Sequence, residues 1–214
     1  FLIFLVFQEA AIPLPPPPPP RDGWDSRFFH LLAMLYKTFG KISKTQKGKI
    51  MDFVSVMMGS KSDWEVMKHC VEIFKKFDVP YEVIITSAHR SPERTKEYVK
   101  DAQERGAEVF IGAAGMAAHL AGAIASMTTN PVIGVPLSGG ALDGLDSLLS
   151  TVQMPASMPV ATMAIGKAGA INSAYLAMQI LALKDKELRG KLLQDRVMKA
   201  KKVELDSAEI EVRI

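Results

Sequence analysis

The feature that most constrains the fold is an alternation of short apolar runs with longer amphipathic stretches, which begins at Asp52. The apolar runs are rich in Val, Ile and Met, and we expect them to form strands at 53–58, 81–86, 108–111, 132–135 and 160–165. The other stretches have helical periodicity, and we expect helices near 63–77, 92–105, 117–127, 172–183 and 185–202. Short apolar strands separated by helices indicate a parallel sheet buried on both faces. The sequence therefore predicts a three-layer α/β fold, in which ligands bind beyond the carboxyl ends of the strands.

The first fifty residues depart from this pattern. Residues 1–7 are apolar, but about 20 such residues are needed to cross a membrane, so they predict no membrane span. An unbroken proline run at 15–20 favours extended polyproline. Residues 27–49 are basic and free of acids, as in a targeting segment, whereas a natural start at Met51 would make all of this upstream sequence. We favour the second reading, with 1–50 a disordered or non-native extension and 51–214 the folded domain with a C-terminal helix.

Charge and cysteine usage narrow the classes of function. The formal net charge is +3, and residues 1–50 hold seven Lys or Arg against three Asp or Glu, which leaves −1 for residues 51–214. A nearly neutral body gives no support to a nucleic-acid partner. The only cysteine, Cys70, shares an apolar helical stripe with Val66, Ile73 and Phe77, which favours packing over reactivity. A reducing, cytoplasmic compartment is the simplest expectation.

Polar residues follow the first expected strand. Gly59 permits a tight turn, and Ser60, Ser62 and Asp63 offer side-chain oxygens at a helix start. Free backbone N–H groups and hydroxyls at such a place suit a phosphate, and a carboxylate suits sugar hydroxyls. An ordinary helix cap by Ser62 or Asp63 explains the same residues equally well.

The second expected strand ends in Ser87-Ala88-His89-Arg90-Ser91-Pro92. Pro92 fits the first turn of the following helix. A guanidinium such as that of Arg90 can fork onto phosphate or carboxylate oxygens, and an imidazole can gain and lose a proton near neutral pH. Because His89 stands at the carboxyl end of a strand, we favour a functional role for it over a structural one.

Two later segments are candidates for the rest of a site. Residues 112–119 are mostly small and would let a planar ligand approach the backbone; His119, placed just inside the next helix, suits a core or supporting role somewhat better than direct catalysis. Residues 138–147 are glycine-rich and polar, as in a mobile flap or a plain connecting loop. The sequence lacks the dinucleotide fingerprint, the P-loop, the nucleophile elbow and any metal-ligand spacing.

Five motifs stand in order between about residues 52 and 193: Met58-Gly59-Ser60-Lys61-Ser62-Asp63-Trp64, Ser87-Ala88-His89-Arg90-Ser91-Pro92, Ala117-Ala118-His119-Leu120, Val152-Gln153-Met154-Pro155 and Ala164-Ile165-Gly166-Lys167-Ala168-Gly169. Together they resemble class I PurE, the N5-carboxyaminoimidazole ribonucleotide (N5-CAIR) mutases of de novo purine biosynthesis. The resemblance implies a flavodoxin-like three-layer fold and a homo-octamer with active sites near subunit contacts. It also implies a ribonucleotide substrate and no metal, ATP, biotin or other cofactor.

The resemblance assigns roles to residues of the strand ends. The implied binding residues are Ser60, Ser87 and Arg90 for the ribose 5′-phosphate, Asp63 for the ribose hydroxyls, and Gly115 with its neighbours for the imidazole and the carboxylate. His89 would be the general acid and base. In the implied reaction the carbamate nitrogen is protonated, carbon dioxide is released in a closed pocket, ring C4 attacks it, and His89 removes the C4 proton. The product is 4-carboxyaminoimidazole ribonucleotide (CAIR).

Two departures from the family pattern and two alternatives accompany this hypothesis. The family usually has glycine at the position of Met116 and proline at that of Ala121, which affects the expected pocket shape. The class II enzyme, which carboxylates the unmodified ribonucleotide (AIR) directly with carbon dioxide, typically has lysine where this chain has Arg90. The other alternative is a non-catalytic flavin- or nucleotide-binding module built on the same type of sheet.

Overall fold

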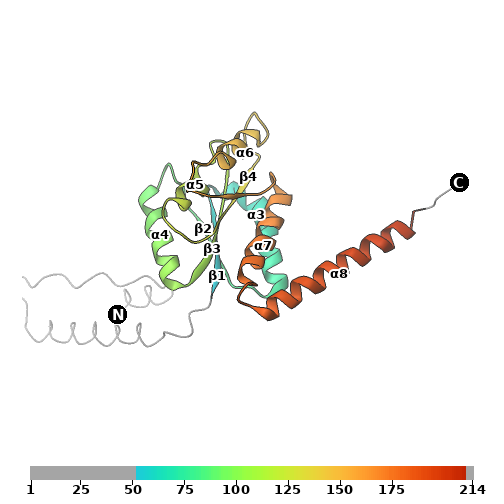
Figure 1. The fold of residues 1–214 in the computed structure, drawn as a ribbon. Coiled ribbons are helices and arrows are strands. Elements are labelled where there is room, and N and C mark those ends of the chain that lie inside the picture. The colour runs from blue at the N-terminus through green and yellow to red at the C-terminus, as the bar shows by residue number, and fades with distance from the viewer. Residues whose placement is uncertain (1–51, 211–214) are drawn as a thin grey trace, which may run out of the picture. The chain divides into compact units, whose positions relative to one another are not determined.

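Five parallel strands form a single sheet in the computed structural model, which describes residues 52–210 (Figure 1). The predictions for residues 1–50 lie outside that part. The strand order is β2-β1-β3-β4-β5, and all four pairings are parallel. The strands are β1 (Phe53–Met58), β2 (Tyr81–Ile85), β3 (Ala107–Gly115), β4 (Val132–Leu137) and β5 (Ala161–Thr162). This is the doubly wound order of flavodoxin-like folds, so the predicted fold class is confirmed.

Helices cover both faces of the sheet. They are a 3₁₀ turn η1 (Lys61–Asp63) and the α-helices α3 (Trp64–Phe77), α4 (Pro92–Arg105), α5 (Leu120–Ala125), α6 (Leu145–Val152), α7 (Lys167–Leu181) and α8 (Lys186–Ala208). In Figure 1, α4 and α5 lie on one side of the strands, and α3 and α7 lie on the other. None of the helices within residues 52–210 is both long enough and apolar enough to cross a membrane.

Side chains alternate along β1, so this strand contributes to two separate apolar clusters. Val54 and Val56 pack into the cluster shared with α3 and α7, whereas Phe53 and Met57 pack into the cluster shared with α4 and α5. Because β1 is central, all six of its residues are buried. Full burial of one such side chain contributes about 1.5–3 kcal/mol. Cys70 belongs to the first cluster, which confirms its packing role, and burial raises the pKa of its thiol to about 12.

Strand β3 is longer than predicted, and the first four of the small residues expected to follow it, 112–115, belong to the strand. Gly112 pairs with Gly134 of β4, and pairing continues to Gly115. A Cβ atom added to Gly112 would lie 2.9 Å from the Cα of Ala121 in α5. The absence of a side chain at Gly112 therefore lets α5 pack closely against β3. The prediction that a planar ligand approaches the backbone is wrong at this residue.

The second half of the chain contains the other differences from prediction. Only two residues of the expected strand at 160–165 pair with β4. Helix α5 is shorter than expected, α7 begins five residues earlier, at Lys167, and α8 continues beyond residue 202 to Ala208. Helix α6 was not predicted, because its first residues belong to the glycine-rich segment interpreted as a flap. Only residues 138–144 are loop.

Candidate active site

The carboxyl ends of β1, β2 and β3 bring three of the predicted segments together. The β1 turn is tied to β3 by the Gly59 N–H, which donates to the Ala113 carbonyl over 3.1 Å. The start of the β2 turn is tied to β1 by the Thr86 N–H, which donates to the Met58 carbonyl over 2.8 Å. The site is therefore fixed by the sheet itself, at the edge that the fold class predicts.

Ser60 and Asp63 cap the short helical turn that follows β1. The Ser62 N–H donates to Ser60 Oγ at 3.4 Å, and the Ser60 N–H donates to Asp63 Oδ2 at 2.9 Å, which together form a capping box. The capping alternative is thus realised, with Ser60 as the N-cap residue and Asp63 completing the capping box. Burial raises the pKa of the Asp63 carboxyl, and hydrogen bonds from the Ser60 backbone, the Ser62 side chain and the Gly59 backbone offset part of the rise.

Hydroxyl groups hold the turn that presents His89. Ser91 Oγ accepts from the Ser87 N–H at 3.1 Å and donates to the Ser87 carbonyl at 3.2 Å. Beneath it, the buried hydroxyls of Thr86 and Thr95 are 2.7 Å apart. Pro92 occupies the first turn of α4, as predicted. Because the turn is bonded to α4 at several points, His89 and Arg90 at its tip are held in a defined position although both are exposed.

Arg90 joins the β1 and β2 turns. Its Nη2 donates to the Gly59 carbonyl at 3.1 Å, and its Nε lies 3.5 Å from Ser87 Oγ. The Ser87 hydroxyl also accepts from the Arg90 backbone N–H at 3.1 Å. One guanidinium and two hydroxyls, those of Ser60 and Ser87, therefore belong to neighbouring turns, which is the donor set that a phosphate monoester requires.

His89 and His119 form a direct hydrogen bond. Nε2 of His89 is 2.7 Å from Nδ1 of His119, and the two rings meet edge to face at 82°. His119 is exposed at the residue before α5, so of the two expected roles the core one is wrong, and the supporting one stays a prediction. A hydrogen bond between two imidazoles requires at least one neutral ring, because each cationic ring has only donors. The sequence offered no signal for this contact between residues 30 positions apart.

Gly115 ends β3 beside the end of β4. A Cβ atom there would lie 3.1 Å from the Leu137 carbonyl oxygen, which is tighter than most real contacts, so glycine favours this close approach of the two strand ends. Residues 138–144 follow β4 and are joined internally by a hydrogen bond from the Ser138 hydroxyl to the Asp143 carboxylate. The first turn of α6 is anchored by the buried Ser147 hydroxyl, which donates to the Leu137 carbonyl at 2.9 Å. The loop of the predicted flap is therefore short and tethered at both ends.

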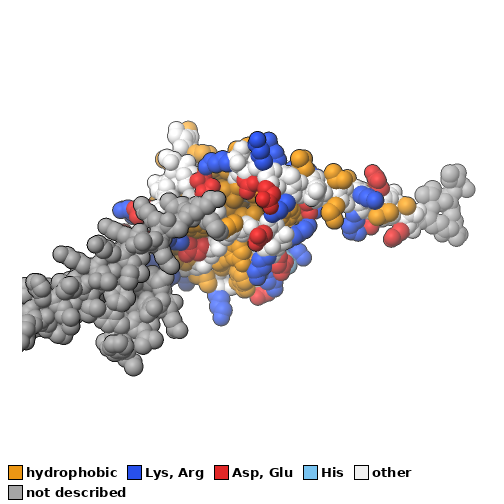
Figure 2. All heavy atoms as spheres, turned by 90° about the horizontal axis from the view of Figure 1, so that it is seen from below, with side chains coloured by type: hydrophobic (Ala, Val, Ile, Leu, Met, Phe, Trp, Pro, Cys, Tyr) orange, Lys and Arg blue, Asp and Glu red, His pale blue; other side chains and the backbone are white. Residues whose placement is uncertain are grey.

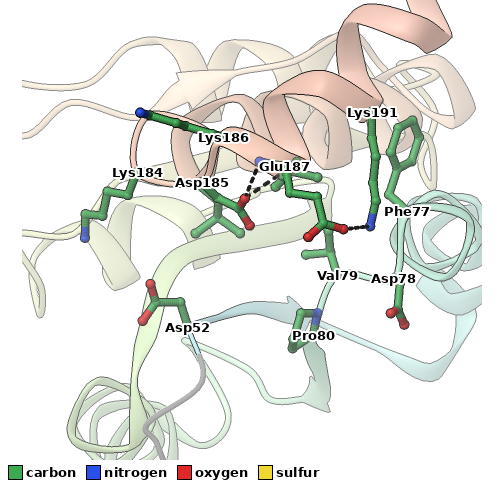
Figure 3. Close-up of a pocket in the computed structure, with 12 residues that line it drawn as sticks. Asp52, Phe77, Asp78, Val79, Pro80, Lys184, Asp185, Lys186, Glu187 and Lys191 are labelled. Carbon is green, nitrogen blue, oxygen red and sulfur yellow. Dashed lines mark hydrogen bonds and ion pairs between the residues drawn. The ribbon is translucent and has the colours of Figure 1, made fainter.

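A pocket of about 660 Å³ lies at the opposite, amino-terminal edge of the sheet (Figure 3). Residues just before β1 and β2 line it, together with the start of α8. Among its charged side chains, Glu187 pairs with Lys191 at 2.9 Å, Lys184 pairs with Glu108 at 2.9 Å, and Asp185 caps α8. The surface seen from below in Figure 2 likewise mixes acidic and basic side chains. None of the predicted site residues lines this pocket, so the carboxyl edge remains the candidate.

Between residues 52 and 210, no group of three or more His, Cys, Asp or Glu side chains is arranged to hold a metal ion. The predicted site residues Ser60, Asp63, Ser87, His89 and Arg90 instead lie on two adjoining turns, and Gly115 lies at the end of the neighbouring strand.

Known proteins resemble this chain over the described domain. The family model described as AIR carboxylase matches residues 53–202. An N5-carboxyaminoimidazole ribonucleotide mutase of Bacillus subtilis is 52% identical over 156 residues, which cover 73% of this chain and 96% of that protein. The proteins of the same name from Saccharolobus solfataricus and Escherichia coli K12 are 57% and 53% identical over 139 residues, 65% of this chain and 87% and 82% of theirs. The crystal structure of Treponema denticola PurE has a TM-score of 0.69 at 25% identity, and covers 75% of this chain and 99% of that one.

Proposed function

This chain belongs to the AIR carboxylase family, and on that premise we propose that His89 carries the protons of an N5-CAIR mutase reaction at the carboxyl edge of the sheet. The enzyme is an isomerase of purine biosynthesis, which moves a carboxyl group from the exocyclic nitrogen of an aminoimidazole ribonucleotide to ring carbon C4. The hydrogen bond between His89 and His119, beside the Arg90 side chain, is the observation that carries the assignment of the proton carrier.

Substrate binding is assigned to the two adjoining turns. Arg90, with the hydroxyls of Ser60 and Ser87, binds the ribose 5′-phosphate. The Asp63 carboxyl accepts hydrogen bonds from the ribose hydroxyls. Gly115 and its neighbours, at the end of β3, are assigned to the imidazole and its carboxylate. This assignment is supported by the Arg90 contacts to Gly59 and Ser87, because they hold the guanidinium between the two turns before substrate arrives.

The chemistry requires one group that first donates a proton and then accepts one. His89 donates a proton to the carbamate nitrogen as the nitrogen–carbon bond breaks, which yields AIR and carbon dioxide. Ring C4 then attacks the carbon dioxide, and neutral His89 removes the C4 proton to restore the aromatic ring. His119 supports both states, because its Nδ1 accepts from a protonated His89 and the pair needs only one neutral ring.

Assembly and location are further parts of the proposal. We infer a homo-octamer that acts in the cytoplasm. The assembly is supported by the exposed apolar side chains of α6 next to the flap, and by the exposure of His89 and Arg90 in the single chain. The cytoplasmic location is supported by the one cysteine of the chain, which is buried and free.

His89→Asn tests the assignment, because asparagine keeps a polar side chain of similar size but cannot act as an acid or base. We expect the rate of interconversion of N5-CAIR and CAIR to fall by about 100-fold or more. His69→Asn is the matched control, since His69 lies on α3 and bonds Glu72 at 2.9 Å. Full activity of the His89 variant would contradict its role. Net carboxylation of AIR by dissolved carbon dioxide, at a rate above interconversion, would favour the class II reaction instead.

A further inference from the structure

Met116 has a backbone conformation that its side chain does not favour. Four non-glycine residues between positions 52 and 210 have a positive φ: Asp78, Met116, Asp143 and Ser157. Three of these have short polar side chains, and aspartate in particular tolerates this region through local hydrogen bonds. Met116, at φ 55°, is long and apolar. Local strain of this kind persists only where the surrounding structure imposes it, and it concentrates at functional sites.

The Met116 side chain lies against the flap. A Cβ atom added to Gly140 would be 3.4 Å from Met116 Cγ, whereas one added to Gly139 would meet nothing within 4 Å. Of the two glycines, only Gly140 therefore neighbours Met116, at a spacing where an added Cβ atom would be at about van der Waals distance from Met116 Cγ. At the base of the flap, a Cβ on Gly115 would lie 3.9 Å from Gly139 Cα. The end of β3 and residues 138–144 thus approach each other at two successive points.

The same segment leads directly to the proposed proton carrier. Met116 follows Gly115 and stands three residues before His119, whose N–H donates to the Ala117 carbonyl at 2.8 Å. His119 in turn bonds His89. The Met116 side chain is 59% exposed, so burial in the core does not explain its presence. It is an apolar group at the boundary between the flap and the turn of the site histidines.

We propose that Met116 is a positioning residue that holds the 138–144 flap closed and so retains carbon dioxide between the two half-reactions; this rests on the proposed function. After the carbamate nitrogen–carbon bond breaks, the electron pair stays on nitrogen, which takes the proton of His89, and free carbon dioxide remains beside AIR. The molecule is neutral, so no charged side chain retains it strongly. Its escape is opposed by a closed flap and an apolar wall, which a flexible methionine can supply.

The test measures how much carbon dioxide escapes at each turnover. N5-CAIR is converted to CAIR in buffer that contains carbon-13-labelled bicarbonate, and mass spectrometry measures the label in each mole of CAIR formed. A run without enzyme gives the spontaneous exchange to subtract. We expect Met116→Gly to raise the label per turnover several-fold and to release AIR, because glycine removes the apolar side chain that stands next to Gly140. Met116→Leu restores an apolar side chain and should return the label close to the wild-type value.

Asp78→Gly is the matched control for backbone relief. Asp78 has φ 57° at the end of α3, so glycine relieves the same kind of backbone conformation there without touching the flap. We expect labelling at the wild-type value for this variant. Wild-type labelling in Met116→Gly, or a rise in Asp78→Gly equal to that in Met116→Gly, would overturn the role given to Met116. Absence of interconversion in the wild type would instead contradict the proposed function.

Discussion

Arg90 shows how one side chain can organise two loops that are distant in sequence. Its guanidinium reaches the Gly59 carbonyl in the β1 turn, and its backbone N–H bonds the Ser87 hydroxyl in its own turn. Arginine suits this position because its rigid fork can bond the protein with one nitrogen while others face a phosphate. Lysine has a single ammonium group on a flexible side chain, so it cannot hold the Gly59 carbonyl and a phosphate in this fixed arrangement.

We predict that Arg90→Lys weakens substrate binding more than it slows the chemical step. The expected loss is about 1.5–3 kcal/mol of binding free energy, the range for a hydrogen bond to a charged group, seen as a rise in KM of about tenfold or more with a smaller change in kcat. Steady-state kinetics of the mutase reaction measures both. Arg94→Lys, on the exposed face of α4, should leave both constants unchanged. A variant with wild-type KM would show that Arg90 does not bind the phosphate.

At the residue scale, sequence reasoning found the groups but not their contacts. Ser87, His89 and Arg90 could be singled out because they follow an apolar run and precede Pro92, which are local signals. The sequence favours a core or supporting role for His119, because a contact across 30 residues leaves no trace in periodicity. The conformation of Met116 was equally hidden, since methionine rarely adopts positive φ and gives no local sign when it does.

At the scale of elements, α8 is held to the body by the packing of Leu188 and Leu192 on the core and by one buried carboxylate. Asp195 is 7% exposed and accepts from Lys76 of α3 at 2.6 Å, from the Tyr175 hydroxyl of α7 at 2.9 Å, and from Lys199 at 2.7 Å. Burial raises the pKa of this carboxyl, but the hydrogen bonds from Lys199, Lys76 and Tyr175 outweigh it and lower the pKa to about 2. The three partners come from three helices, so Asp195 fixes where the projecting helix leaves the domain.

We predict that Asp195→Asn lowers the free energy of unfolding by about 1–2 kcal/mol, because the two lysines are more than half exposed and regain water. The folded-state pKa lies below the unfolded value of 3.8, so this stabilisation is present above that pH and is lost as pH falls toward 2. Denaturant unfolding between pH 7 and pH 2.5 should therefore show the two proteins converging in acid. Asp206→Asn, which removes an exposed pair with Lys202 on the same helix, is the control. An equal loss of stability in both variants would contradict the anchor.

The elements themselves were predictable where both ends carry local signals. The bounds of α4 match the prediction at both ends, because Pro92 starts the helix and Gly106, with φ 105°, ends it. Helix α6 is absent from the prediction because three glycines precede it. Its faces are also reversed relative to an ordinary surface helix, since it buries Ser147 and Thr151 and exposes two of its leucines. The run 160–165 has a strand composition, but it lies at the edge of the sheet, and only Ala161 and Thr162 pair with β4.

At the scale of the whole molecule, an exposed apolar stripe runs along α6, directly after the flap. Leu142, Leu145, Leu149 and Val152 recur at helical spacing along α6 and the turn before it, and each is about half exposed or more. An apolar stripe of this kind marks an interface more often than a free surface. It adjoins the flap that leads into α6, so a second copy packed on α6 would also limit the motion of residues 138–144. Assembly and closure of the site are then linked.

We predict that Leu149→Asp disrupts assembly and activity together. A charged carboxylate in the centre of an apolar interface costs several kcal/mol unless it is paired, so the variant should sediment as smaller species than the wild type. Its mutase activity should fall and should recover in part at high protein concentration, because association then offsets the weakened interface. Lys100→Asp places the same side chain on the polar outer face of α4 and should change neither property. If Leu149→Asp dissociates and yet keeps full activity at low concentration, the single chain closes its own site, and the flap contact at Met116 must then be sufficient without a neighbouring copy.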